Sequence, residues 1–469
     1  MEALGRISIS VLIAFFLAVD LSYGQHSAEQ ILAKGVDYGA QGKFKEAEQE
    51  FEKALEIDPL YGTAKRALKV IKDVIDQKIK TEAAVHYFKG ISHAEKERLN
   101  ESISEFSRAI EINPRFVMAY RGRGVANGLK GRLDQAISDF SKAIEINPRD
   151  ADSYFSRGIA YCHRNQFYRA ISDYTKAIEL DPGLAAAYSN RGKAYLEKAQ
   201  LDLAISDFNK AIKMNPRDAE AYTNRGVAYL GTGQCTKAIS DFDKAIEINP
   251  EDAEAYKTRG MAYWCKGRLN RAISDFSKAL EINPRYADAY NIRGFAHYHR
   301  NQFDQAISDY TKAIELDPKL SVAYKNRGTA YGKVKKQYDK AIADFDKAIE
   351  MNPKYADAYN DRGIAYLSKG QYDQAISDYT KAIELDPELA AAYSNRGEAY
   401  LGKGQYDQAI SDYTKAIELD PGLAMAYSNR GFVMEKLGNI RMACSDWKQA
   451  CALGDCDGYI FAEKKGLCE

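Results

Sequence analysis

The sequence predicts an all-α protein built as a solenoid of tandem helical hairpins. Three observations lead to this prediction: a 34-residue pattern recurs along the chain, each copy holds two stretches with helical apolar spacing, and nearly every copy closes with a proline. One hairpin of this length cannot bury its own apolar faces, whereas stacked copies cover one another.

The copy at residues 390–423 shows how one unit is organised. Apolar residues recur at intervals of three and four in both of its halves, which is the spacing of one helix face. Gly404 lies between the halves, and glycine readily takes the left-handed conformation that ends a helix. Pro421 ends the second helix, because proline has no N–H and disfavours helix in the residue before it.

The first 24 residues do not follow the repeat. Residues 7–19 form an apolar run after a basic residue, and the small residues Ser22 and Gly24 precede a candidate cleavage point. We therefore expect residues 1–24 to be a secretory signal peptide and the protein to be exported, either periplasmic or secreted. The alternative is an uncleaved membrane anchor formed by residues 7–19, although this run is shorter than the ~20 residues of a spanning helix.

The spacing of the 11 prolines defines the remaining layout. Residues 28–61 form the first unit, residues 62–82 add one further helix, and residues 83–457 hold eleven contiguous units, the last of which lacks the proline. Residues 458–469 are expected to form a C-terminal capping helix. The twelve units leave no room for an independent catalytic domain.

Composition and motifs argue against several classes of function. Lysine plus arginine equals aspartate plus glutamate at 66 each, so no net charge directs the chain to nucleic acid. The sequence contains no HExxH, CxxC, phosphate loop or GxSxG motif. We therefore expect no catalytic site, no metal and no cofactor.

The repeat resembles the tetratricopeptide repeat family in most of its defining positions. The unit at residues 253–286 matches that pattern with Tyr256, Gly260, Tyr263, Ala272, Phe276, Ala279 and Pro284. The resemblance implies a right-handed superhelix in which the first helix of each unit lines a concave groove. It also implies that this groove holds peptides or other proteins.

Ten successive units depart from the family pattern in the same way. Position 7 of the unit, usually leucine in the family, is arginine from Arg123 to Arg430, and position 23 is aspartate from Asp139 to Asp446. Arginine suits a two-pronged contact with a carboxylate. We predict a structural ladder of ion pairs, formed either within each hairpin or across the stacking surface.

The groove is where the resemblance places a partner, at positions 2, 5, 9, 12 and 13 of each unit. The apolar lining is richest around Met261, Trp264, Phe295 and Tyr298, and we expect these four side chains to form one patch that anchors a partner. The alternative is that these side chains pack between neighbouring helices.

Further residues complete the predicted groove. Lys257, Asn291 and Lys325 occupy position 5 of three consecutive units and are expected to give polar contacts to a bound chain. Phe155 and Ile159, at positions 5 and 9 of an earlier unit, are expected to line the groove as well.

Four of the seven cysteines lie in the last 26 residues. If the tail folds back on the last repeat helix, Cys444 falls opposite Cys468, and Cys451 lies near Cys456 at the turn. Two disulfides would then clamp the end of the array, as is common in exported proteins. Free buried cysteines are the alternative.

The sequence thus favours a non-enzymatic interaction scaffold that binds a peptide segment or a partner protein in a largely apolar groove. One alternative is a small-molecule or glycan-binding protein that uses Trp264 and Tyr298 as an aromatic platform. Another alternative is a structural rod that self-associates. A membrane contact is expected only through an uncleaved N-terminal segment.

Overall fold

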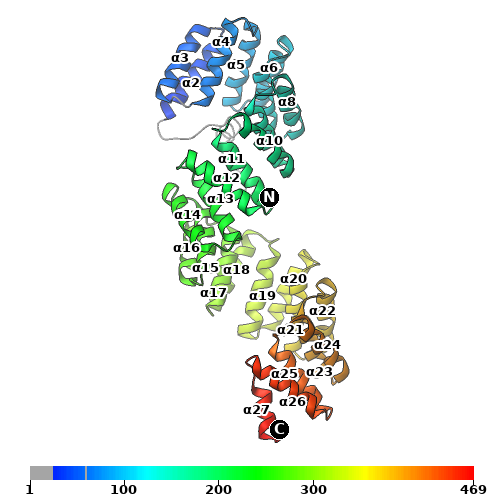
Figure 1. Cartoon of the computed structure of the whole chain (residues 1–469). Coiled ribbons are helices and arrows are strands. Elements are labelled where there is room, and N and C mark those ends of the chain that lie inside the picture. Colours follow the sequence, from blue (N-terminus) through cyan, green and yellow to red (C-terminus); the bar gives the residue numbers. More distant parts are fainter. Residues whose placement is uncertain (1–24, 59–60, 469) are drawn as a thin grey trace. The chain divides into compact units, whose positions relative to one another are not determined.

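The computed structural model describes residues 25–58 and 61–468, and the regular secondary structure within these ranges is entirely helical (Figure 1). The predicted signal peptide at residues 1–24 lies outside the described residues. Along the sequence the helices divide into two compact units, one ending at Pro250 and the other beginning at Glu251, and each unit is described by itself.

The N-terminal unit begins with a hairpin, one added helix and a second hairpin. Its helices are α2 (Gln25–Ala40), α3 (Phe44–Ile57), α4 (Gly62–Ile75), α5 (Thr81–Glu95), α6 (Leu99–Ile112), α7 (Val117–Leu129), α8 (Leu133–Ile146), α9 (Ala151–His163), α10 (Phe167–Leu180), α11 (Ala185–Glu197), α12 (Leu201–Met214), α13 (Ala219–Gly231) and α14 (Cys235–Ile248).

The C-terminal unit is a run of hairpins that ends in a short helix. Its helices are α15 (Ala253–Cys265), α16 (Leu269–Ile282), α17 (Ala287–His299), α18 (Phe303–Leu316), α19 (Ser321–Lys335), α20 (Tyr338–Met351), α21 (Ala356–Ser368), α22 (Tyr372–Leu385), α23 (Ala390–Gly402), α24 (Tyr406–Leu419), α25 (Ala424–Lys436), α26 (Ile440–Ala452) and α27 (Asp457–Lys464).

From α7 onward, within each unit, the first helix of a hairpin packs against its own second helix and against the second helix of the preceding hairpin, whereas α5 packs on α6 and on α2. This arrangement confirms the predicted fold class, an all-α solenoid of tandem helix pairs. The added helix α4 is shorter than the predicted range 62–82. It ends at Ile75, because the chain then turns, with Gln77 in the left-handed region at φ 57°.

At the centre of a repeat, an aromatic ring of the second helix packs against a glycine of the first helix. Phe276 of α16 is fully buried, and its ring lies so close to Gly260 of α15 that a Cβ atom on this glycine would approach the ring to 2.5 Å. Only glycine allows the two helices to come this near. The alanines at neighbouring positions, such as Ala272 and Ala279, are also fully buried and keep the helix spacing short.

The predicted arginine–aspartate ladder forms within the hairpins. In α23 and α24, Nε and Nη2 of Arg396 donate to the two carboxylate oxygens of Asp412 at 2.7 and 2.8 Å. The remaining Nη1 donates to Thr380 of the preceding hairpin at 3.0 Å, so the guanidinium also joins adjacent repeats. The hydrogen bonds to Asp412 outweigh burial and raise the pKa of Arg396, which therefore stays charged.

Ten such pairs follow one another: Arg123–Asp139, Arg157–Asp173, Arg191–Asp207, Arg225–Asp241, Arg259–Asp275, Arg293–Asp309, Arg327–Asp344, Arg362–Asp378, Arg396–Asp412 and Arg430–Asp446. The aspartates of these pairs are buried. A buried carboxylate without a partner is costly, so each arginine is needed to keep its aspartate in the interior.

The C-terminal end of the array is capped by α27, which packs on α25 and α26. The ring of Trp447 is fully buried, 5.3 Å from the ring of Phe432 and 6.1 Å from that of Phe461. The structure also joins Cys444 to Cys468, with Cα atoms 5.6 Å apart, and Cys451 to Cys456, with Cα atoms 3.9 Å apart. These are the two cysteine pairs named in the sequence analysis.

The cysteine pairs can be tested directly. Mass spectrometry of unreduced digests should find the peptide containing Cys444 linked to the one containing Cys468, because the tail folds back beside α26. Cys451 and Cys456 should resist alkylation until a reductant is added. Four thiols that alkylate without reductant, in protein taken from outside the cytoplasm, would contradict both disulfides.

A second prediction concerns the tyrosine of α22 that fills the aromatic position of its repeat. The hydroxyl of Tyr379 is buried and has no hydrogen-bond partner among the described residues. Tyr379→Phe should therefore stabilise the protein by roughly 1 kcal/mol, because a buried unpaired polar atom is removed. Chemical denaturation measures this change. Tyr174→Phe is the control, since the Tyr174 hydroxyl contacts Cys162 Sγ at 3.5 Å, and an equal gain in both variants would refute the explanation.

Candidate functional site

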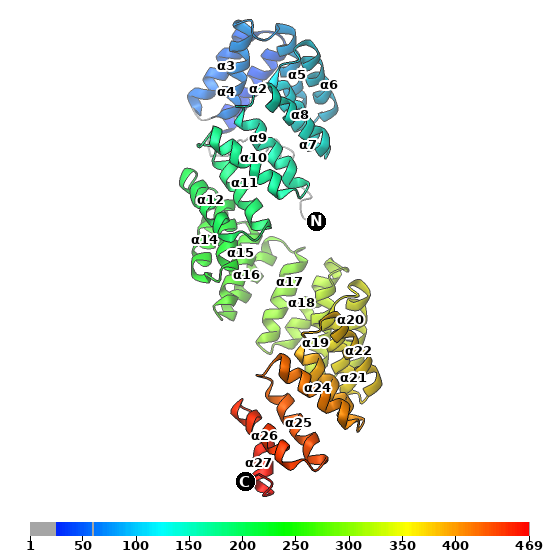
Figure 2. The ribbon, with the colours of Figure 1, turned by 45° about the vertical axis from the view of Figure 1, so that its right-hand side comes forward.

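Three exposed apolar side chains lie at position 9 of first helices in the C-terminal unit. Met261 of α15, Phe295 of α17 and Ile364 of α21 are exposed by 41, 40 and 42% respectively. We call these three residues the apolar stripe. Figure 2 shows α15, α17, α19 and α21 following one another along this unit. Thr329 occupies the equivalent position in α19, between Phe295 and Ile364.

An aromatic cluster borders the stripe between α15 and α17. The rings of Trp264 and Phe295 are stacked, with centroids 5.2 Å apart and planes 29° from parallel. His299 contacts both rings edge-on, at 5.2 Å from Trp264 and 4.5 Å from Phe295. The structure therefore brings together Trp264 and Phe295, which the sequence analysis placed in one patch.

Trp264 and Tyr298 are only half-buried, and both also belong to the packing between helices. Trp264 packs against the small core formed by Ala272, Phe276 and Ala296, and Tyr298 packs against the core around Tyr310. Part of each ring is therefore packed between helices, as the alternative interpretation predicted, and part of it is exposed.

The three predicted polar contacts have partners inside the protein. Lys257 pairs with Glu254 at 2.8 Å, and Asn291 accepts a hydrogen bond from Asn326 of the next repeat at 3.1 Å. Lys325 pairs with Asp361 of the next repeat at 3.2 Å. We predicted contacts to a bound chain at these positions, whereas the structure uses their polar atoms to link neighbouring side chains.

The ion pair between Lys325 and Asp361 is a stable part of the structure. Burial alone would lower the pKa of its ammonium group, but the Asp361 carboxylate outweighs burial and raises that pKa. Thr329 donates a further hydrogen bond to Asp361 at 3.0 Å. The contact is therefore part of the scaffold that spaces α19 from α21.

Phe155 and Ile159 do not join this surface. They lie in the N-terminal unit and are exposed by only 2 and 3%, in an apolar core with Val125 and Ala160. The expectation that they offer accessible groove contacts is wrong, because their side chains fill the interior of that unit.

Sequence reasoning did not select two residues that the structure brings to this surface. Ile364 is as exposed as Phe295 and carries the stripe on to α21. The second residue is His299, which contacts Trp264, Phe295 and Tyr298. Ile364 could have been selected from the sequence, because it is an apolar residue at position 9 of its unit with small or polar neighbours. No signal in the sequence indicated the ring contacts of His299.

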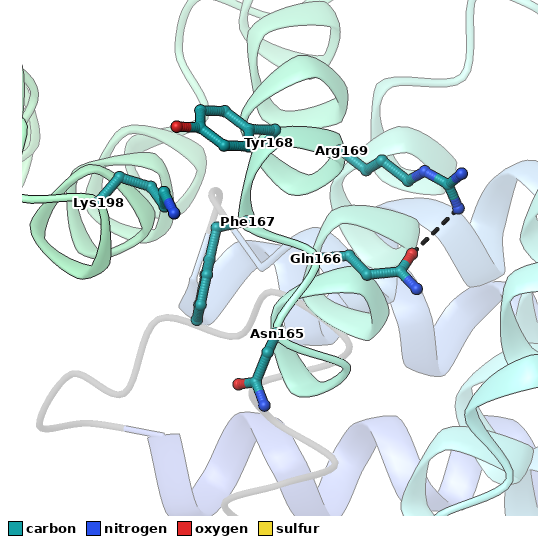
Figure 3. A pocket seen from close by; sticks show the side chains of 6 residues that line it. All are labelled: Asn165, Gln166, Phe167, Tyr168, Arg169 and Lys198. Carbon is teal, nitrogen blue, oxygen red and sulfur yellow. Dashed lines mark hydrogen bonds between the residues drawn. The ribbon is translucent and has the colours of Figure 1, made fainter.

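A second candidate is a hollow of about 380 Å³ at the turn between α9 and α10 (Figure 3). Tyr168 is strongly exposed there, and Nζ of Lys198 lies 4.8 Å from the centre of its ring. The other nearby cation, Arg169, donates to Gln166 at 3.1 Å. Both cations already contact neighbours, which makes this hollow a weaker candidate than the stripe.

Within residues 25–58 and 61–468 no group of three or more histidine, cysteine, aspartate or glutamate side chains could hold a metal ion. No helix in the described part of the chain combines the length and apolar character needed to cross a bilayer.

The stacked hairpins and their first-helix surface define a helical-repeat protein. Family models described as tetratricopeptide repeat match residues 32–59, 151–184, 189–253, 253–286, 287–320 and 390–423. A further model described as TPR repeat matches residues 129–163, 335–370 and 363–404. Together these matches extend over more than half of the chain, and the chain belongs to the tetratricopeptide repeat family.

Several solved structures are similar to this chain. Yeast Tom70 is 18% identical, with a TM-score of 0.41, over 82% of this chain and 96% of its own. A tetratricopeptide repeat protein from Parabacteroides merdae is 20% identical, with a TM-score of 0.43, over 53% of this chain and 98% of its own. YrrB, described as a TPR protein with an unusual peptide-binding site, is 30% identical over 39% of this chain and 95% of its own, with a TM-score of 0.34. No curated protein sequence matches the chain.

The two stacked rings should respond differently to truncation. Trp264→Ala should lower stability by roughly 2–3 kcal/mol, somewhat less than a fully buried ring, because part of the indole fills the core beneath α15. Phe295→Ala should cost under about 1 kcal/mol, since much of that ring is exposed. Thermal unfolding of both variants measures the difference. Equal losses would show that Phe295 is a core residue.

Proposed function

We propose that the chain is a non-enzymatic scaffold that holds a peptide segment or partner protein on the first-helix surface of its C-terminal unit. The observation that carries this proposal is the apolar stripe, in which Met261, Phe295 and Ile364 stay exposed although buried alanines surround them along their helices. Exposed apolar side chains at equivalent positions of neighbouring repeats are typical of a protein-binding surface.

The surface is well suited to a partner because its backbone is held rigidly. The pairs Asn291–Asn326 and Lys325–Asp361 link α17 to α19 and α19 to α21. The first helices therefore present their side chains at fixed spacing before a partner arrives, which lowers the entropic cost of binding.

The stacking of Trp264 on Phe295 favours this function over a glycan platform. A sugar ring needs a free aromatic face, whereas one face of Trp264 is covered by Phe295 and another part is buried in the core. The exposed apolar edges that remain suit aliphatic and aromatic side chains of a protein partner.

We also propose that the protein works outside the cytoplasm. The apolar run at residues 7–19 supports this location, and so do the two C-terminal disulfides, because disulfides persist in oxidising compartments. The alkylation measurement on the non-cytoplasmic fraction tests the location together with the cysteine pairs.

A paired substitution tests the binding surface. Met261→Ala with Phe295→Ala should weaken capture of partners from an envelope extract by about thirtyfold, since loss of a buried apolar anchor often costs ~2 kcal/mol or more. Unfolding must be measured on the same preparation, so that binding is compared per folded molecule.

The matched control removes an exposed methionine elsewhere in the same unit. Met351 lies on the second helix α20 and is exposed by 37%, so Met351→Ala should leave capture unchanged. If the paired variant captures the same proteins as the wild type, the stripe is not the binding surface and the proposal fails.

A further inference from the structure

The short helix α27 lies against the last member of the position 9 series. Phe432 of α25 occupies position 9 of its unit, which is the place that Met261, Phe295 and Ile364 hold in the apolar stripe. The centre of its ring lies 6.0 Å from that of Phe461 in α27, and Phe432 is less exposed than the three residues of the stripe. The tail therefore helps to cover an apolar side chain whose equivalents in the stripe are open to solvent.

The packing between α27 and the last hairpin rests on a few apolar residues. The ring of Trp447 is fully buried, with its centre 6.1 Å from that of Phe461. Gly458 of α27 lies so close to the indole that a Cβ atom there would approach it to 2.3 Å, and Ala462 is fully buried in the same cluster. Because α27 has only eight residues, and helices shorter than about 12 residues are marginal on their own, it depends on being held against α26.

Each end of α27 is tied to α26 by a disulfide. Cys456 directly precedes the first residue of α27 and is joined to Cys451, whereas Cys468 follows the helix and is joined to Cys444. All four cysteines are partly exposed. A cross-link of this kind makes a tethered segment about thirtyfold to a thousandfold less prone to detach, because it restricts the detached state. The disulfides are therefore an essential part of what holds α27 in place.

We propose that α27 is a redox-sensitive strap. With both disulfides formed, it covers Trp447 and part of Phe432; when both are reduced, it detaches and adds Phe432 to the apolar side chains that a partner can contact. This proposal rests on the proposed function, because it assigns regulation to the same first-helix surface. Disulfides persist in an oxidising compartment, so the strap stays closed there until a dithiol reductant acts on it.

The opening step is a thiol–disulfide exchange with a dithiol, either a small molecule or a protein. One thiolate of the reductant attacks Sγ of Cys468 and displaces Cys444 as a thiolate, which then takes up a proton. The second thiol of the reductant attacks the mixed disulfide, releases Cys468 and closes the reductant's own disulfide. Two electrons and two protons pass from the dithiol to the cysteine pair, and the same exchange with a second dithiol reduces Cys451–Cys456.

A purely structural role of the disulfides gives a different expectation. Disulfides that only stabilise the last repeat would, when reduced, loosen α25, α26 and α27 together, since neighbouring helices of a repeat array are coupled. A strap loosens alone, because α26 still packs on α25 and Nε1 of Trp447 still donates to the carbonyl oxygen of Ser428 in α25 at 3.2 Å. The two roles therefore differ in which backbone amides become exposed.

Hydrogen exchange of the full-length protein measures which helix opens. The variant Cys444→Ser with Cys468→Ser, kept without reductant, should exchange the amides of α27 about thirtyfold faster than the wild type, because one tether is gone. Adding dithiothreitol to the wild type should give at least that increase, whereas the amides of α25 and α26 should change by less than about threefold. Cys162→Ser is the matched control, since this cysteine is free and the variant should exchange as the wild type does.

Binding of anilinonaphthalene sulfonate, a dye that fluoresces on apolar surface, tests whether Phe432 becomes accessible. Dithiothreitol should raise the dye fluorescence of the wild type about twofold, and Phe432→Ala should reduce this increase. Met425 lies on the same helix and is already 64% exposed, so Met425→Ala should leave the increase unchanged.

Three outcomes would overturn the proposal: equal exchange of the α27 amides in all forms, opening of α25 and α26 as large as that of α27, or a full dye response in Phe432→Ala. These measurements use no partner, so they do not depend on the proposed function. If α27 opens as expected while Met261→Ala with Phe295→Ala captures the same proteins as the wild type, the strap stands and the proposed function fails.

Discussion

An arginine on the first helix of each of ten repeats binds the second helix of its own hairpin, and the remaining packing depends on this contact. The guanidinium lies on the first helix, binds the buried aspartate of the second helix with two N–H groups, and commonly offers its third nitrogen to the preceding hairpin, as Arg293 does to Ser277 at 3.1 Å. Apolar contacts between helices are tolerant of small sliding and rotation, whereas a two-pronged ion pair is not. The ladder therefore fixes the register at which each aromatic ring meets its glycine.

This fixed register has a direct effect on the candidate binding surface. The exposed residues of α15, α17 and α21 occupy equivalent places because each hairpin contacts the next in the same way. The polar pairs at positions 5 and 6, such as Lys325 with Asp361, reinforce that spacing on the exposed side. The spacing of these helices thus comes from charged and polar contacts, and the apolar side chains at position 9 stay partly exposed.

Much of the fold could be predicted from the sequence because the chain repeats itself. The spacing of prolines located the hairpins, and the constant Arg396 and Asp412 positions indicated an ion pair before any geometry was known. The period could not distinguish contacts within a hairpin from contacts between hairpins, since both recur every 34 residues. In the structure the same arginine makes both. The early end of α4 was also missed, because apolar spacing does not report where the backbone turns.

The candidate site was predictable only in part. Apolar residues at position 9 indicated the stripe, but the polar residues chosen beside it were Lys257, Asn291 and Lys325, whose partners are neighbouring side chains. The sequence alone does not show that Lys325 is paired, because its partner Asp361, at 3.2 Å, lies 36 residues away along the chain. Phe155 and Ile159 were misplaced for a related reason, since position in the repeat does not determine whether other segments cover a side chain.

The contact between one hairpin and the next, which we call a joint, is the hydrogen bond from an arginine to the second helix of the preceding hairpin. Because the joints are alike, the array can change in length by whole units. Arg396 meets Thr380 across its joint, and Arg362 meets Asp346 across the joint before it, with hydrogen bonds of 3.0 and 2.5 Å. If residues 356–389 were excised in frame, Arg396 would face Asp346 in place of Thr380 and would still find an acceptor. Whole units can therefore be lost or duplicated by recombination within the gene without leaving an unmatched joint. Such an array can lengthen or shorten its first-helix surface in single-hairpin steps while the ladder stays continuous.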